Sequence, residues 1–255
     1  FHLFTHAMFK ALLFLGAGSI IHAVHSNEMS AMGGLRKYMP VTHITFLVAC
    51  LAISGIWPLS GFFSKDEILT ACFAYSPAMG WIMTAIAGLT AFYMFRLYYG
   101  IFWGRENRQL HAEHTPHEAP VTMTLPLVVL AVVTLGAGFI PFGHFVSSNG
   151  TAYDIHIDTT VATISLCVAA AGILIASWMY ARERQDVAES LARRFRTLHT
   201  AAYHRFYIDE VYQFITHRII FRCISTPIAW FDRNVVDGFM NMLARGANGC
   251  LLYTS

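Results

Sequence analysis

The chain has 255 residues, of which 56% are hydrophobic and 13% charged, and its formal net charge is +2. Soluble domains carry about 25% charged residues, so roughly half of the charge that normally faces water is missing. This composition excludes a soluble enzyme, and no nucleic-acid partner is expected. It predicts a polytopic membrane protein.

The two ends of the chain have unusual sequences. Phe1 stands directly inside an apolar run, without the Met or basic flank of a secretory signal. We therefore expect a C-terminal fragment whose upstream helices are absent. The last residues, 250–255, resemble translated adaptor sequence and are given no functional weight.

Five apolar segments follow one another, at about 1–24, 41–73, 80–103, 121–142 and 158–181. A bilayer crossing needs about 20 apolar residues. The second segment is too long for one straight helix, because it would span about 50 Å against a hydrocarbon core of about 30 Å. The predicted fold is therefore all-α: a bundle of about five transmembrane helices, one of them broken.

The basic residues alternate between the loops. Arg36 and Lys37 lie in the first loop, Arg105 and Arg108 in the third, and Arg182 and Arg184 after the fifth segment, whereas 74–79 and 143–157 contain neither Lys nor Arg. Five crossings place every basic loop on one side, which the positive-inside rule assigns to the cytoplasm or matrix.

The first segment carries a column of ionisable side chains. His2, His6 and Lys10 are spaced four residues apart, so that neighbours lie on nearly one helix face. Histidine changes charge near neutral pH, and lysine does so when it is desolvated. Ionisable groups inside membrane segments are candidates for a transport pathway. The column is therefore interpreted as a proton relay; the alternatives are packing histidines and a lysine that extends to the membrane surface.

The second segment combines a helix break with charge. Gly55, Pro58 and Gly61 interrupt its helical hydrogen bonding, and Lys65, Asp66 and Glu67 follow. Backbone groups freed at membrane depth are tolerated only where protein or a water-filled cavity satisfies them.

We expect Ser60 to cap the second half-helix. The positive end of that helix would then disfavour a charged Lys65, whereas Asp66 and Glu67 would favour it. Such opposed effects suit a lysine that releases and regains a proton.

Two further regions carry less information. His111, His114 and His117, with Glu113 and Glu118, lie in a Pro-containing polar loop, where this spacing indicates a metal site only weakly. A solvated loop is favoured, and no metal site is expected. The five cysteines are scattered and form no ligand motif.

The chain changes character after Arg184, and the predicted units are 1–182 and 183–255. Residues 203–245 carry apolar positions at helical spacing: Ile208, Val211, Tyr212, Ile215 and Ile219. Interspersed charges prevent a crossing, so an interfacial or lateral amphipathic helix is predicted, kinked at Pro227. The alternative is a tail helix packed on its own bundle.

Two stretches carry a family resemblance. HLFTHAMFKALLFLGAGSIIH and MGGLRKYMPVTHITFLVACLAISGIWPLSGFFSKDEIL resemble the antiporter-like membrane subunits of respiratory complex I. YHRFYIDEVY resembles the start of the lateral helix in the most distal group of these subunits, subunit L or chain 5. The resemblance covers about residues 1–245.

By motif, the resemblance implies that His2, His6 and Lys10 belong to the family's proton relay and that Lys65 and Asp66 form its terminal broken-helix site. The family's upstream Glu–Lys pair would precede Phe1, and the anchoring helix after the lateral helix is also missing.

The implied function is proton translocation coupled to quinone reduction in other subunits. The chain would bind no cofactor; NADH, FMN, iron–sulfur clusters and quinone would belong to partner subunits. The implied partners are neighbouring membrane-arm subunits, lipid and protons, in the bacterial inner membrane or, in a eukaryote, the mitochondrial inner membrane. A cation/proton antiporter subunit of the Mrp type and a structural clamp that braces neighbouring subunits remain as alternatives.

Overall fold

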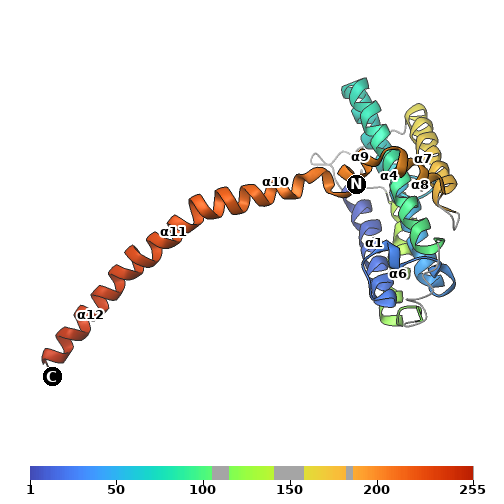
Figure 1. The fold of residues 1–255 in the computed structure, drawn as a ribbon. Helices are drawn as coiled ribbons and strands as arrows, with labels where there is room; N and C mark the ends of the chain where they lie inside the picture. Colours follow the sequence, from blue (N-terminus) through green and yellow to red (C-terminus); the bar gives the residue numbers. More distant parts are fainter. Residues whose placement is uncertain (105–114, 141–157, 182–185, 255) are drawn as a thin grey trace. The chain divides into compact units, whose positions relative to one another are not determined.

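The computed structural model describes residues 1–104, 115–140, 158–181 and 186–254, and all regular structure in these ranges is helical. The predicted all-α membrane bundle is thus confirmed. The chain divides into two compact units, Phe1–Glu189 and Ser190–Ser255. Figure 1 follows the helices of both units.

Four helices of the first unit are long and apolar enough to cross a membrane. They are α1 (His2–Val24), α4 (Pro77–Phe102), α6 (Val121–Gly136) continued by the 3₁₀ turn η3 (Ala137–Phe139), and α7 (Thr159–Tyr180). Two short 3₁₀ turns, η1 (Met29–Ala31) and η2 (Leu35–Lys37), lie between α1 and α2.

The second predicted segment is two helices, α2 (Pro40–Ser54) and α3 (Ser60–Tyr75). Gly55 ends α2 in the left-handed conformation, with φ 77°. The Gly55 amide bonds the carbonyl of Ala52, and the Ile56 amide bonds that of Leu51, which is the Schellman pattern of helix ends. Pro58 lies in the connection itself.

Two expectations for this break were wrong in detail. Gly61 lies in the first turn of α3, where a Cβ atom would come within 1.8 Å of the Ala52 carbonyl oxygen. The glycine is therefore needed for close approach of the two half-helices. Ser60 is not the cap: Leu59 holds that position, and the buried Ser60 hydroxyl has no hydrogen-bond partner among the described residues.

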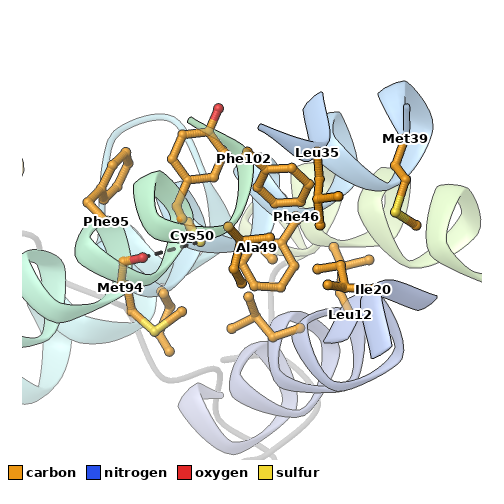
Figure 2. Close-up of a cluster of buried hydrophobic side chains, with 14 of the residues drawn as sticks. Leu12, Ile20, Leu35, Met39, Phe46, Ala49, Cys50, Met94, Phe95 and Phe102 are labelled. Carbon is orange, nitrogen blue, oxygen red and sulfur yellow. Dashed lines mark hydrogen bonds between the residues drawn. The ribbon is translucent and has the colours of Figure 1, made fainter. Parts of the chain in front are cut away.

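The core of the first unit lies between α1, α2 and α4. Phe46 and Phe102 pack with their ring centroids 5.6 Å apart, between Leu35 and Ala49 (Figure 2). Gly16 of α1 makes room for this layer, since a Cβ atom there would lie 2.9 Å from the Phe46 ring.

Helices α4 and α7 also pack closely, through glycine. A Cβ atom on Gly172 would lie 2.6 Å from the carbonyl oxygen of Gly88. Small residues at such crossings let helix backbones approach, which is how membrane helices gain van der Waals contact.

A glutamate from the third loop caps the start of α2. The Glu118 carboxylate accepts hydrogen bonds from the Val41 amide at 2.8 Å and from the Thr42 hydroxyl at 2.6 Å, and the Thr42 amide lies 3.4 Å away. Free amides at a helix N-terminus favour an anionic partner. Glu118 thereby attaches residues 115–120 to the bundle.

The second unit is helical almost throughout. The boundary between the units falls within α8 (Asp186–Arg194), and α9 (Arg196–Tyr203) follows it. A long helical run then continues to the end of the described chain. It is formed by α10 (Ile208–Phe214), η6 (Ile215–Ser225), α11 (Thr226–Phe231), η7 (Asp232–Val236) and α12 (Asp237–Thr254). The long run begins at Ile208 and not at Tyr203, because Arg205, Phe206 and Tyr207 have positive φ and form a turn.

The predicted kink at Pro227 is replaced by a gradual curve (Figure 1). Helical dihedral angles continue through Ser225 and Thr226, and the Thr226 amide bonds the carbonyl of Phe221 in the i→i+5 pattern of a π-helix. This wider turn places the proline, which has no N–H, near the start of a new α-helical stretch, where its ring is tolerated.

Replacing Gly61 by Ala tests the close approach at the break. Overpacking usually costs about 1–3 kcal/mol, and here the atom that must yield is backbone. We expect Gly61→Ala to lower the yield of monodisperse protein in detergent severely, as measured by size-exclusion chromatography. Gly18→Ala is the control, because a Cβ atom at Gly18 has no neighbour within 4 Å. Equal yields for the two variants would contradict the assignment.

Replacing Glu118 by Ala removes the acceptor for the start of α2. Losing a helix cap costs about 1–2 kcal/mol, so the thermal unfolding midpoint should fall by about 2–8 °C. Glu118→Gln, which keeps a neutral acceptor, should lie between Ala and the native residue. An unchanged midpoint for Glu118→Ala would show that the cap does not stabilise the bundle.

Candidate proton-transfer site

The site is built on the end of α2. Of its last four carbonyls, that of Leu51 bonds the Ile56 amide and that of Ala52 bonds the Gly55 amide. The carbonyl of Ile53 accepts a hydrogen bond from the ammonium group of Lys65 on α3. A lysine side chain thus satisfies a backbone group that the helix break sets free.

Gly55 lies beneath the side chain that makes this contact. Its φ of 77° turns the chain away from α2, and a Cβ atom at this position would lie 3.4 Å from Cδ of Lys65. The aliphatic part of Lys65 therefore passes over the glycine to reach the Ile53 carbonyl.

The helix-dipole effect expected at Lys65 has the opposite sign. The ammonium group is bound at the C-terminal end of α2, where the partial charge is negative and favours a cation. The positive start of α3, from which the opposite effect was expected, lies on the lysine's own helix.

Asp66 is almost completely buried, at 1% exposure, and neither carboxylate oxygen has a hydrogen-bond partner among the described residues. The described residues show no ion pair between Asp66 and Lys65, because consecutive residues of a helix point in different directions. Asp158, at the start of α7, lies near enough to interact with it electrostatically. An unpaired buried carboxylate is energetically costly, which makes Asp66 a candidate for proton uptake and release.

The histidine column of α1 begins beside this site. The ring centroids of His2 and His6 are 5.7 Å apart, and His6 also packs against Phe9 at 5.3 Å. Lys10 follows one turn later and is half-buried, with no hydrogen bond or ion pair to another described residue. The structure thus places His2 and His6 side by side but shows no direct contact from them to Lys10 or Lys65 within hydrogen-bond distance.

Ser64, which the sequence analysis did not single out, connects the two parts. Its hydroxyl lies 3.0 Å from Nδ1 of His2 and 2.9 Å from the hydroxyl of Thr5, both on α1. The only sequence signal for Ser64 is its position directly before Lys65. Its partners are 59 and 62 residues away, so no local pattern reveals them.

His43, another histidine inside the bundle, was also not predicted as part of the site. Nε2 of His43 on α2 lies 2.7 Å from the hydroxyl of Tyr98 on α4, which also accepts a hydrogen bond from the Trp103 indole at 3.3 Å. The guanidinium of Arg36 lies 3.8 Å from the Trp103 ring centroid. These contacts explain His43 as a hydrogen-bonded packing residue.

The loop histidines form no described metal site. His111, Glu113 and His114 lie outside the described residues, His117 packs near the ring of His22 at 6.3 Å, and Glu118 caps α2. Within the ranges that the structure covers, no group of three or more His, Cys, Asp or Glu residues is arranged to hold a metal ion.

Comparison with known proteins identifies related membrane proteins. Residues 1–91 match the family model described as "NADH:quinone oxidoreductase/Mrp antiporter, TM". The matched range contains α1, the broken pair α2 and α3, and therefore every residue of the candidate site on these helices.

Individual relatives extend the similarity along the chain. It is 40% identical to NAD(P)H-quinone oxidoreductase chain 5 of Picosynechococcus sp., covering 95% of this chain and 42% of the relative. It is 34% identical to the chloroplastic subunit 5 of Mesostigma viride (95% of this chain, 40% of the relative) and to NADH-quinone oxidoreductase subunit L of Rickettsia bellii (97% and 41%).

The chain spans about two fifths of the length of these relatives. The matched membrane domain and the identity to these relatives along the rest of the chain point to the same group of proteins. Along at least 95% of its length, this multi-pass membrane chain is therefore similar to the antiporter-like membrane subunits named NAD(P)H-quinone oxidoreductase chain 5 or NADH-quinone oxidoreductase subunit L.

Proposed function

We propose that the chain is part of a proton-translocating membrane subunit of NAD(P)H:quinone oxidoreductase. The observation that carries this proposal is the ammonium group of Lys65 on a carbonyl freed by a helix break. A cation inside a membrane bundle, held by a single backbone oxygen among the described residues, can give up its proton more easily than one held in a full ion pair.

Three features support a pathway through this lysine. The half-helices are separated at Gly55–Leu59, so backbone polarity reaches the interior of the bundle. Asp66 adds a buried acid next to Lys65 in the sequence, and the His2–His6 pair lies across Ser64 on α1. Lys10 continues the column along α1.

In the proposed mechanism, quinone reduction in other subunits shifts the electrostatic balance along the membrane arm. Lys65 then releases its proton towards one side of the membrane, with Asp66 as the neighbouring acid. The His2, His6 and Lys10 column returns a proton from the other side. The chain carries no redox step.

The proposed setting follows from this role. NADH, FMN, iron–sulfur clusters and quinone are bound by partner subunits, and this chain contacts antiporter-like neighbours in the membrane arm. The membrane is the bacterial inner membrane, or the mitochondrial inner membrane in a eukaryote.

Substitution of Lys65 in the assembled complex tests the function. Lys65→Ala removes the titrating group and Lys65→Arg keeps a charge that cannot be released, so both should lower proton translocation at least about tenfold. Translocation is measured by dye quenching in proteoliposomes at equal complex content.

The control is Lys37→Ala, because Lys37 is exposed on η2 and is the one lysine of the chain outside the proposed pathway; the other two are Lys10 and Lys65. It should pump normally. Native pumping by Lys65→Ala in a fully assembled complex would reject the role of Lys65.

An Mrp-type cation/proton antiporter is the second candidate, because the matched family model includes both kinds of protein. The two differ in what drives proton movement. Sodium-driven proton exchange by the vesicles without quinone reduction would favour the antiporter.

The third candidate is a structural clamp, in which the long helical run of the second unit braces neighbouring subunits. Ile208, Val211 and Tyr212 are more than half exposed along the long helical run, as expected of a helix that braces other surfaces. Shortening residues 203–245 separates the roles: we expect an assembled complex that pumps poorly, measured by native gel electrophoresis and dye quenching. A purely structural clamp predicts that the complex fails to assemble.

A further inference from the structure

Thr5 and Ser64 form a hydroxyl pair between the histidine column and the broken helix. Thr5 is fully buried and Ser64 is 1% exposed. The Ser64 oxygen lies 3.0 Å from Nδ1 of His2 and 2.9 Å from the Thr5 oxygen, and the Thr5 oxygen lies 3.1 Å from the carbonyl oxygen of His2. The contacts thus form a chain that starts and ends on His2.

This chain can be satisfied when Nδ1 of His2 carries no hydrogen. Ser64 then donates its hydroxyl hydrogen to Nδ1 and accepts the hydrogen of Thr5. Each hydroxyl has one hydrogen to donate and lone pairs to accept, so both hydroxyl hydrogens are bonded.

The chain can also be satisfied when Nδ1 carries a hydrogen, but with every bond reversed. Nδ1 donates to Ser64, Ser64 donates to Thr5, and Thr5 donates to the His2 carbonyl. Again both hydroxyl hydrogens are bonded. Only rotation of the two hydroxyl groups separates the two arrangements, and the heavy atoms need not move.

A single hydroxyl would not satisfy the hydrogen bonds of both arrangements equally well. Without Thr5, the one acceptor among the described residues for the hydrogen of Ser64 in the reversed arrangement is the Gly61 carbonyl, which lies 3.5 Å away, at the outer limit of a hydrogen bond. A buried donor without a partner is costly.

We propose that Ser64 and Thr5 are positioning residues that hold the His2 ring in one orientation whether or not Nδ1 carries a hydrogen. The inference rests on the proposed function, in which His2 repeatedly gains and loses a proton. Holding the ring in one orientation then keeps it in place through both states. The hydroxyls themselves neither gain nor lose protons over the cycle.

The pair also lies where other charges act on His2. His6 from α1 and Lys65 from α3 interact electrostatically with the His2 ring. Any change in pH dependence must therefore be compared with variants that leave these groups in place, as the substitutions below do.

The experiment uses the assembled complex in proteoliposomes and measures proton translocation from pH 5.5 to 8.5. Ser64→Ala removes the partner of Nδ1 in both arrangements, and we expect about fivefold slower translocation, the equivalent of one hydrogen bond. Thr5→Val leaves the Ser64 contact but removes the acceptor used when Nδ1 is protonated. It should therefore shift the pH profile to lower pH, because the protonated ring is disfavoured.

Two variants serve as matched controls. Thr5→Ser keeps the hydroxyl and should retain the native pH profile. Thr84→Val removes an equally buried hydroxyl whose bond goes to the Gly80 carbonyl of its own helix, at 2.8 Å, and should leave the profile unchanged. A shift in Thr84→Val as large as that in Thr5→Val would overturn the proposal, since the effect would then be one of packing.

Failure of this inference can be told apart from failure of the proposed function. Native rates and pH profiles in Ser64→Ala and Thr5→Val, in a complex that Lys65→Ala inactivates, would overturn the positioning role and leave the function standing. If Lys65→Ala also pumps normally, the function itself is rejected.

Discussion

The hydrogen bond from Lys65 to the Ile53 carbonyl is the interaction on which the site depends. A helix that ends inside a membrane leaves carbonyls without partners, and each unsatisfied group costs several kcal/mol in hydrocarbon. The Schellman turn at Gly55 satisfies two of the last four carbonyls, and the ammonium group satisfies a third. The break and the charge therefore stabilise each other: the lysine supplies a donor to the broken helix, and the broken helix supplies an oxygen at its negative end to the lysine.

The sequence predicted the membrane helices well because their signal is local. Segment lengths, apolar runs and the alternation of basic loops all depend on neighbours along the chain, and the bounds of α1, α4 and α7 differ from the predicted ones by a few residues. The errors fell where backbone geometry competes with residue preference. Ser60 has the right residue type for a cap, but Leu59 takes that position, and the π-turn before Pro227 absorbs the kink that proline normally causes.

The site was predictable only in part. Lys65 and His2 stand out because a charge or an imidazole is rare at membrane depth, and such rarity can be read from one sequence. Ser64 and His43 do not stand out, and Glu118 stands out only as part of a weak metal-site pattern, since serine, loop glutamate and a lone histidine have many ordinary roles. Their partners lie 55 to 77 residues away along the chain. What identifies them is the packing of helices, which a pattern of single residues does not contain.

Three consecutive residues of α3 now connect three parts of the bundle. A helix turns by about 100° per residue, so Ser64, Lys65 and Asp66 cannot face the same neighbour. Ser64 bonds α1, Lys65 bonds the end of α2, and Asp66 is buried where Asp158 of α7 acts on it. Because one rigid turn carries all three, a rotation of α3 that lengthened the Lys65 bond would also move Ser64 relative to the His2 ring. The position of the lysine and the orientation of the histidine are therefore mechanically linked, without a direct bond between the two side chains.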